Sequence, residues 1–67
     1  MPNKIRELKA MLRNAGFFMR PGKGSHSVWS HPNMADRNVV ISGGDGDDAK
    51  PYQERMVQKA IKKSGGR

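Results

Sequence analysis

The sequence has 67 residues, and 13 Lys or Arg against six Asp or Glu give a formal net charge of +7. So short a chain forms one domain that buries only about 60% of its unfolded surface, and its 34% hydrophobic residues leave too little apolar material for an enclosed substrate cavity. The lack of cysteine excludes disulfides and thiolate zinc sites, and no stretch approaches the roughly 20 apolar residues that span a bilayer.

Residues 3–15 are predicted to form an amphipathic helix. Its apolar face consists of residues at helical spacing: Ile5, Leu8, Met11, Leu12 and Ala15. Asn3 is the expected N-cap, and Gly16 suits the left-handed residue that follows a helix end. Phe17 is then expected to pack back onto the last turn. Beside the apolar face runs a basic stripe, which either contacts a polyanion or is solvated surface: Arg6, Lys9 and Arg13.

Three runs typical of strands follow, at residues 17–20, 25–31 and 37–42. Residues 21–24 are predicted to form a turn, because proline fixes φ and glycine permits positive φ. Residues 32–36 break the second strand. Because the connections are short, the strands are predicted to form an antiparallel meander.

A second helix is predicted from Ala49, after an irregular loop of glycine and aspartate at residues 43–48. Pro51 is acceptable in its first turn. The expected apolar face consists of Tyr52, Met56, Val57, Ala60 and Ile61. A second basic stripe lies on the other side: Arg55, Lys59 and Lys62. Residues 64–67 are expected to fray.

The predicted fold is an α+β two-layer sandwich, with one domain over residues 1–67 and the order helix-strand-strand-strand-helix. Because apolar residues are few, both helices are expected to cover one face of the three-stranded antiparallel sheet and leave the other face open. Double-stranded-RNA-binding domains have this layout. The net positive charge also favours nucleic acid as the partner.

Two histidines are candidates for proton transfer near neutral pH. His31 ends a predicted strand and is expected to be structural. His26 follows a turn in which glycine lets a phosphate approach the backbone and Lys23 supplies a positive charge. A phosphate beside a histidine is the arrangement that RNA cleavage needs. Strand alternation places His26 and Trp29 on opposite faces but does not tell which face is open.

Other motifs in the chain do not indicate a catalytic or metal site. The segment 22–25 lacks the spacing of a Walker A loop. Asp45, Asp47 and Asp48 lack the distal glutamate of an EF-hand, so we expect no metal and no cofactor. Ser25 has no visible base and acid partners for nucleophilic catalysis.

Three segments carry a resemblance to a known family: Ala15-Gly16-Phe17 at the end of the first helix, Lys23-Gly24-Ser25-His26, and His31-Pro32. In these segments and in the last helix, the chain resembles the HicA toxin family. It departs from the family at Ser27, where many members have a second histidine or an aromatic, and in the acidic loop 43–48. The resemblance implies a toxin that cleaves messenger RNA, is neutralised by a HicB-type antitoxin, and has its catalytic histidine at His26.

We therefore expect a metal-independent endoribonuclease that acts in the cytoplasm and does not bind membranes. The residues expected to hold single-stranded mRNA are Lys23, Gly24, Ser25 and the two basic stripes. His26 would act as a general base or a general acid, and the second proton carrier would be Lys23, His31 or water. Two alternatives are a non-catalytic RNA-binding module and a protein that docks an acidic partner.

Overall fold

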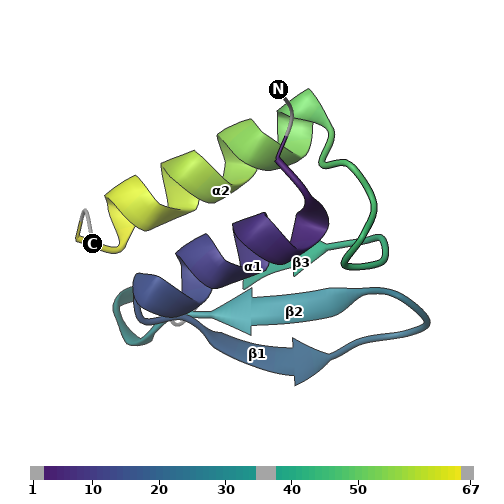
Figure 1. Ribbon diagram of the computed structural model, residues 1–67. Helices are drawn as coiled ribbons and strands as arrows, with labels where there is room; N and C mark the ends of the chain where they lie inside the picture. Colours follow the sequence, from purple (N-terminus) through teal and green to yellow (C-terminus); the bar gives the residue numbers. More distant parts are fainter. Residues whose placement is uncertain (1–2, 35–37, 66–67) are drawn as a thin grey trace.

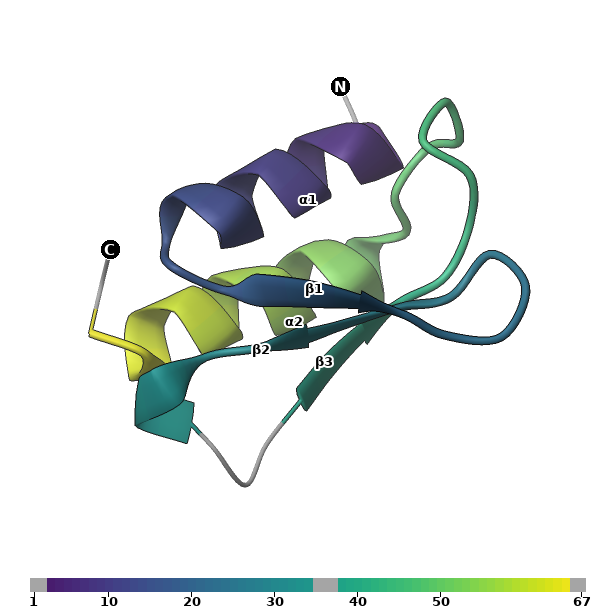
Figure 2. The ribbon, with the colours of Figure 1, turned by 90° about the horizontal axis from the view of Figure 1, so that it is seen from below.

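Two helices cover one face of a three-stranded antiparallel sheet and leave the other face open (Figure 1, Figure 2). The computed structural model describes residues 3–34 and 38–65. The elements are α1 (Ile5–Asn14), β1 (Phe18–Pro21), β2 (Ser27–Ser30), the short 3-10 helix η1 (Pro32–Met34), β3 (Asn38–Ile41) and α2 (Pro51–Lys63). The predicted α+β class and element order are confirmed, while residues 35–37 and 66–67 of the predicted break, third strand and tail lie outside the described residues.

The first turn of α1 differs from the sequence prediction, because Lys4 and not Asn3 is the N-cap. The backbone N–H of Lys4 donates to the side chain of Glu7 at 2.6 Å. Asn3 instead connects the start of the chain to the second helix. Its carbonyl accepts a hydrogen bond from the N–H of Ala49 at 2.7 Å, and its own N–H donates to Glu54 at 3.1 Å.

The C-terminal end of α1 is as predicted. Gly16 has a φ of 95°, a left-handed conformation that side chains disfavour. The N–H of Gly16 donates to the carbonyl of Arg13 at 3.1 Å, and that of Phe17 donates to the carbonyl of Leu12 at 3.0 Å. This pair of bonds is the Schellman motif, which satisfies the last carbonyls of a helix. It also turns Phe17 into the core, where it is buried.

The central strand β2 tells which sheet face the helices cover. Ser27 and Trp29 are buried beneath the helices, whereas Val28 is only partly buried. Val28 pairs with Arg20 on one side and Val40 on the other, and both of these are exposed. The open face is therefore the one that carries Val28.

Trp29 is the largest fully buried side chain of the core between the layers. The other core members come from α1, β3, α2 and the residues that follow α1 or precede α2: Ile5, Leu8, Leu12, Ala15, Phe17, Val39, Ile41, Ala49, Val57 and Ala60. The indole N–H donates to Ser27 Oγ at 3.0 Å, so the one polar atom of Trp29 is satisfied. Over the described chain, no helix is long and apolar enough to cross a membrane.

The buried row of α2 differs from the predicted one. Tyr52 was predicted to be apolar core but is 52% exposed, and Gln53 takes the buried position. The amide of Gln53 is satisfied at both ends: its Nε2 donates to the carbonyl of Ser42 at 3.1 Å, and its Oε1 accepts from the N–H of Lys50 at 2.8 Å. These hydrogen bonds orient Gln53 toward the end of β3. The neighbouring Tyr52 therefore faces outward.

The end of α2 is also more ordered than predicted. Ser64 was expected to fray, but it is the C-cap and is buried. Its hydroxyl donates to the carbonyl of Ile61 at 2.8 Å, and its own carbonyl accepts from the amide of Asn33 at 3.1 Å. Asn33 thus fastens the segment after β2 to the end of the second helix.

Candidate active site

His26 lies in the turn between β1 and β2, not in the strand that was predicted to begin at Ser25. Two backbone hydrogen bonds close this turn. The N–H of Gly22 donates to the carbonyl of His26, and the N–H of His26 donates to the carbonyl of Lys23, both at 3.0 Å. The His26 side chain is exposed. The structure therefore presents the imidazole to solvent at the tip of a hairpin.

The imidazole of His26 is held by a hydrogen bond within the turn. Its Nδ1 lies 2.9 Å from the carbonyl oxygen of Lys23. A carbonyl oxygen only accepts hydrogen bonds, so Nδ1 carries the proton. In the neutral ring, Nε2 then has a free lone pair. In this tautomer, Nε2 is the ring nitrogen that can accept a proton.

The same turn leaves backbone donors free. Among the described residues, no acceptor is found for the N–H groups of Lys23, Gly24 or Ser25. Gly24 has a φ of 59°, and a Cβ built on it would meet nothing within 4 Å. Successive N–H groups of this kind form a concavity that suits an anion. Lys23, Gly24, Ser25 and His26 thus all lie in one turn, although Ser25 and His26 were predicted to begin the second strand.

Ser25 also has a contact that the sequence did not reveal. Its Oγ accepts a hydrogen bond from the N–H of Gly43 at 3.3 Å. Gly43 opens the loop that connects β3 to α2, and Figure 2 shows that loop and the hairpin at the same end of the molecule. Ser25 therefore anchors the hairpin of His26 to the rest of the domain.

The acidic loop beside the hairpin is held by lysines and backbone. Asp45 accepts a hydrogen bond from Lys9 at 2.7 Å, and Asp48 from Lys4 at 2.5 Å. The hydrogen bond from Lys9, followed by its charge, lowers the pKa of Asp45 below the usual value. Asp47 accepts the N–H of Gly44 at 2.9 Å. No group of three or more potential ligands in the described chain could hold a metal ion.

The first basic stripe is not a uniform row. Lys9 is committed to Asp45, and the guanidinium of Arg13 lies 5.5 Å from the centre of the Trp29 ring, within cation–π distance. Arg6 is exposed. Arg13 is exposed as well, so two of the three cations of this predicted RNA contact face solvent, while Lys9 is paired with a carboxylate.

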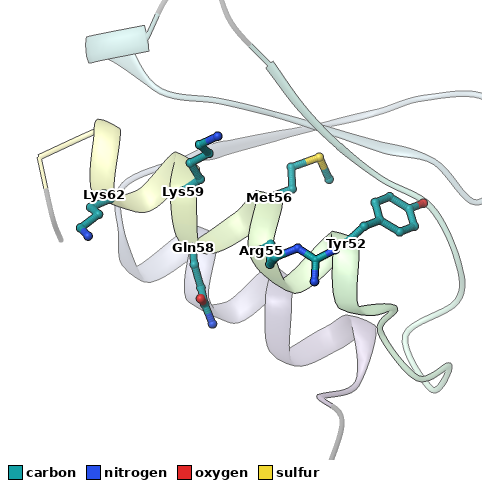
Figure 3. Close-up of a pocket in the computed structure, with 6 residues that line it drawn as sticks. All are labelled: Tyr52, Arg55, Met56, Gln58, Lys59 and Lys62. Carbon is teal, nitrogen blue, oxygen red and sulfur yellow. The ribbon is translucent and has the colours of Figure 1, made fainter.

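The second basic stripe lines a shallow groove on the outer side of α2 (Figure 3). The residues that line it are Tyr52, Arg55, Met56, Gln58, Lys59 and Lys62. All three predicted cations of this helix are thus on one surface. Tyr52 joins them, although its hydrophobicity and helical spacing had predicted it to be part of the apolar core.

His31 lies at the other end of β2 from His26. Its Nε2–H donates to the carbonyl of Ala15 at 3.1 Å, and its Nδ1 accepts the N–H of Asn33 at 3.0 Å. The ring also packs against the edge of Phe17, with centroids 4.9 Å apart. Five residues of extended chain place His31 about 16 Å from His26. The two histidines do not share a site, which removes His31 as the second proton carrier.

We expect His31→Ala to lower the free energy of unfolding by about 1–3 kcal/mol, because the buried carbonyl of Ala15 and the N–H of Asn33 lose their partner. RNA cleavage by the folded fraction should be unchanged. Thermal melts and cleavage assays below the melting range measure both quantities. A fall in activity without a loss of stability would contradict the structural role of His31.

The chain matches a family of known proteins. The profile of the family described as HicA toxin of bacterial toxin-antitoxin matches residues 5–65, from the start of α1 to beyond the end of α2. The match includes the hairpin of His26 and the anchoring loop. No curated protein matches the chain.

Proposed function

The chain belongs to the HicA toxin family of bacterial toxin–antitoxin systems, and on this premise we propose that it cleaves messenger RNA with His26 as the catalytic residue. Family membership makes the chain a toxin with a cognate antitoxin as its partner. The finer proposal depends on one observation: the bond from Nδ1 of His26 to the carbonyl of Lys23, which leaves Nε2 free to accept a proton.

In the proposed reaction, the RNA supplies its own nucleophile. Nε2 of His26 removes the proton of a ribose 2′-hydroxyl, and the 2′-oxygen attacks the adjacent phosphorus. The bond from phosphorus to the 5′-oxygen of the next nucleotide breaks, and that oxygen takes a proton from water or from Lys23. The products are a 2′,3′-cyclic phosphate and a free 5′-hydroxyl. The positive ring formed on His26 is stabilised by the carbonyl of Lys23 at 2.9 Å.

The turn supports this reaction through charge as well as proton transfer. The free N–H groups of Lys23, Gly24 and Ser25 would donate to the phosphate, where negative charge grows in the transition state. The exposed side chain of Lys23 adds a positive charge. Distributed Lys and Arg side chains would hold the single strand without reading its sequence. We expect the toxin to act on mRNA in the cytoplasm.

The test is cleavage of single-stranded RNA by the purified chain in excess EDTA. We expect cleavage at the rate without EDTA, because the aspartates of loop 43–48 are engaged by Lys9, Lys4 and a backbone N–H rather than free for a cation. End analysis of the fragments should give 2′,3′-cyclic phosphates. Loss of cleavage in EDTA with recovery in magnesium would replace this mechanism by a metal-dependent one. RNA binding without any cleavage would reduce the chain to a binding module.

A further inference from the structure

Tyr52 has the most unusual surroundings among the exposed apolar side chains. Large hydrophobic side chains exposed in the described structure are Phe18, Met19, Val40 and Tyr52. The first three belong to the sheet, and only Tyr52 lies on a helix among cations. Its position follows from the burial of Gln53, which turns Tyr52 away from the core.

The groove around Tyr52 has two sides set by helical geometry. Tyr52, Met56 and Lys59 are spaced i, i+4 and i+7, and extend along one side of α2 (Figure 3). Arg55, Gln58 and Lys62 follow one another along the other side. The lining contains three cations and no carboxylate, and both ion pairs found among the described residues involve the lysines of the N-terminal segment instead.

These neighbours favour a single nucleic-acid strand as the occupant. An exposed aromatic ring binds any base by stacking, and cations one turn apart bind the phosphates on either side. The three cations match a polyanion in charge, and no carboxylate opposes it. From Tyr52 to Lys62 the groove is about 15 Å long, by the rise of an α-helix.

The start of the groove is connected to the catalytic hairpin by two successive residues. The carbonyl of Ser42 accepts the amide of Gln53, next to Tyr52, and the N–H of Gly43 donates to Ser25, next to His26. Figure 1 shows that α2 begins at the same end of the molecule at which the hairpin turns. A strand leaving the groove at Tyr52 would therefore reach the hairpin across residues 42–43.

We propose that the groove on α2 binds an unpaired nucleotide of the RNA substrate, with Tyr52 stacked on the base and Arg55, Lys59 and Lys62 at the phosphates. The proposal rests on the RNA-cleaving function above and adds a substrate subsite outside the hairpin. It commits the enzyme to single-stranded RNA, because a base in a duplex is stacked between its neighbours and cannot lie on Tyr52.

The test measures binding of a fluorescent single-stranded RNA carrying 2′-O-methyl groups, which removes the nucleophile and so prevents cleavage by the wild-type chain. We expect Tyr52→Ala to weaken binding about 5- to 150-fold, the range for loss of one base–aromatic stack. Tyr52→Phe keeps the ring and should bind like the wild type. An oligonucleotide with an abasic site at the stacked position should make Tyr52→Ala and the wild type bind equally.

A matched pair on the open sheet face controls for exposed rings and charge. Phe18 is 60% exposed, and Arg20 is exposed two residues further along β1. Phe18→Ala and Arg20→Glu should leave RNA affinity unchanged, whereas Arg55→Glu should weaken it and flatten its dependence on salt. The opposite pattern would place the RNA on the sheet and overturn the proposal.

The remaining outcomes separate this proposal from the proposed function. Cleavage of unmodified RNA by the wild type, together with unchanged affinity in Tyr52→Ala, would overturn the subsite and leave the ribonuclease intact. Binding that depends on Tyr52 without any cleavage would support the subsite and overturn the catalytic role. Unchanged RNA affinity with lost antitoxin binding would assign the groove to the antitoxin instead. Circular dichroism of each variant confirms the fold.

Discussion

Replacing His26 by alanine is expected to lower the rate of RNA cleavage by about 10²- to 10⁴-fold, the usual contribution of a positioned general acid or base, and to abolish toxicity in cells. The imidazole is exposed at the hairpin tip and, among the described residues, its one hydrogen bond is to the carbonyl of Lys23, so the fold should remain intact. RNA binding should persist because the distributed cations are unchanged. Single-turnover cleavage, RNA affinity and thermal melting measure the three quantities.

A second variant separates proton transfer from positioning. In His26→Gln, an amide can still donate a hydrogen bond to the carbonyl of Lys23, but it cannot accept and release a proton near neutral pH. We expect it to be as inactive as His26→Ala. Activity of His26→Gln near the wild-type level would show that the hydrogen bond, and not proton transfer, is what the hairpin needs. Wild-type cleavage by His26→Ala would remove the catalytic assignment altogether.

Leu8→Ala is expected to be the most damaging of the aliphatic truncations in α1. Leu8 is fully buried at the centre of the helix, and truncation of such a residue costs about 2–5 kcal/mol. A domain of this size has a free energy of unfolding near the lower end of about 5–15 kcal/mol. The melting temperature should fall by roughly 4–8 °C per kcal/mol. Thermal melts followed by circular dichroism give both values.

Ile61→Ala provides a graded comparison, because Ile61 is only partly buried against the core. We expect it to destabilise the domain less than Leu8→Ala does. Lys63→Ala, at the exposed end of α2, should melt like the wild type. Equal melting of Leu8→Ala and the wild type would mean that α1 does not pack as the structure shows.

The element order and the buried face of α1 could be predicted from the sequence because the pattern is strong and local. Leucine and isoleucine recur at helical spacing, and Gly16 marks the end of the helix. The face of α2 could not be predicted in the same way. Hydrophobicity ranks Tyr52 above Gln53, but the buried amide of Gln53 is satisfied by Ser42, which lies 11 residues away. A partner so distant in sequence has no local signal.

The candidate site likewise combines residues that the local sequence predicts with contacts to distant residues that it does not predict. The residues of the turn were proposed from the chemistry of glycine, lysine and histidine, and the structure shows that two backbone hydrogen bonds close this turn. The contacts that fix the orientation of these residues could not be predicted from the sequence. The tautomer of His26 depends on the local bond to Lys23, and the position of the hairpin depends on the bond from Gly43 to Ser25, 18 residues apart. The commitment of Lys9 to Asp45 likewise depends on the loop, 36 residues away.

Contacts between the two ends of the chain determine when, during protein synthesis, the domain can complete its fold. Asn3 bonds Ala49 and Glu54, and Leu8 shares its core with Val57. The ribosome makes the hairpin of His26 before any of these later residues, yet contacts so distant in sequence form only once both partners have been made. The core between α1 and α2 can therefore be completed only after α2 has left the ribosome.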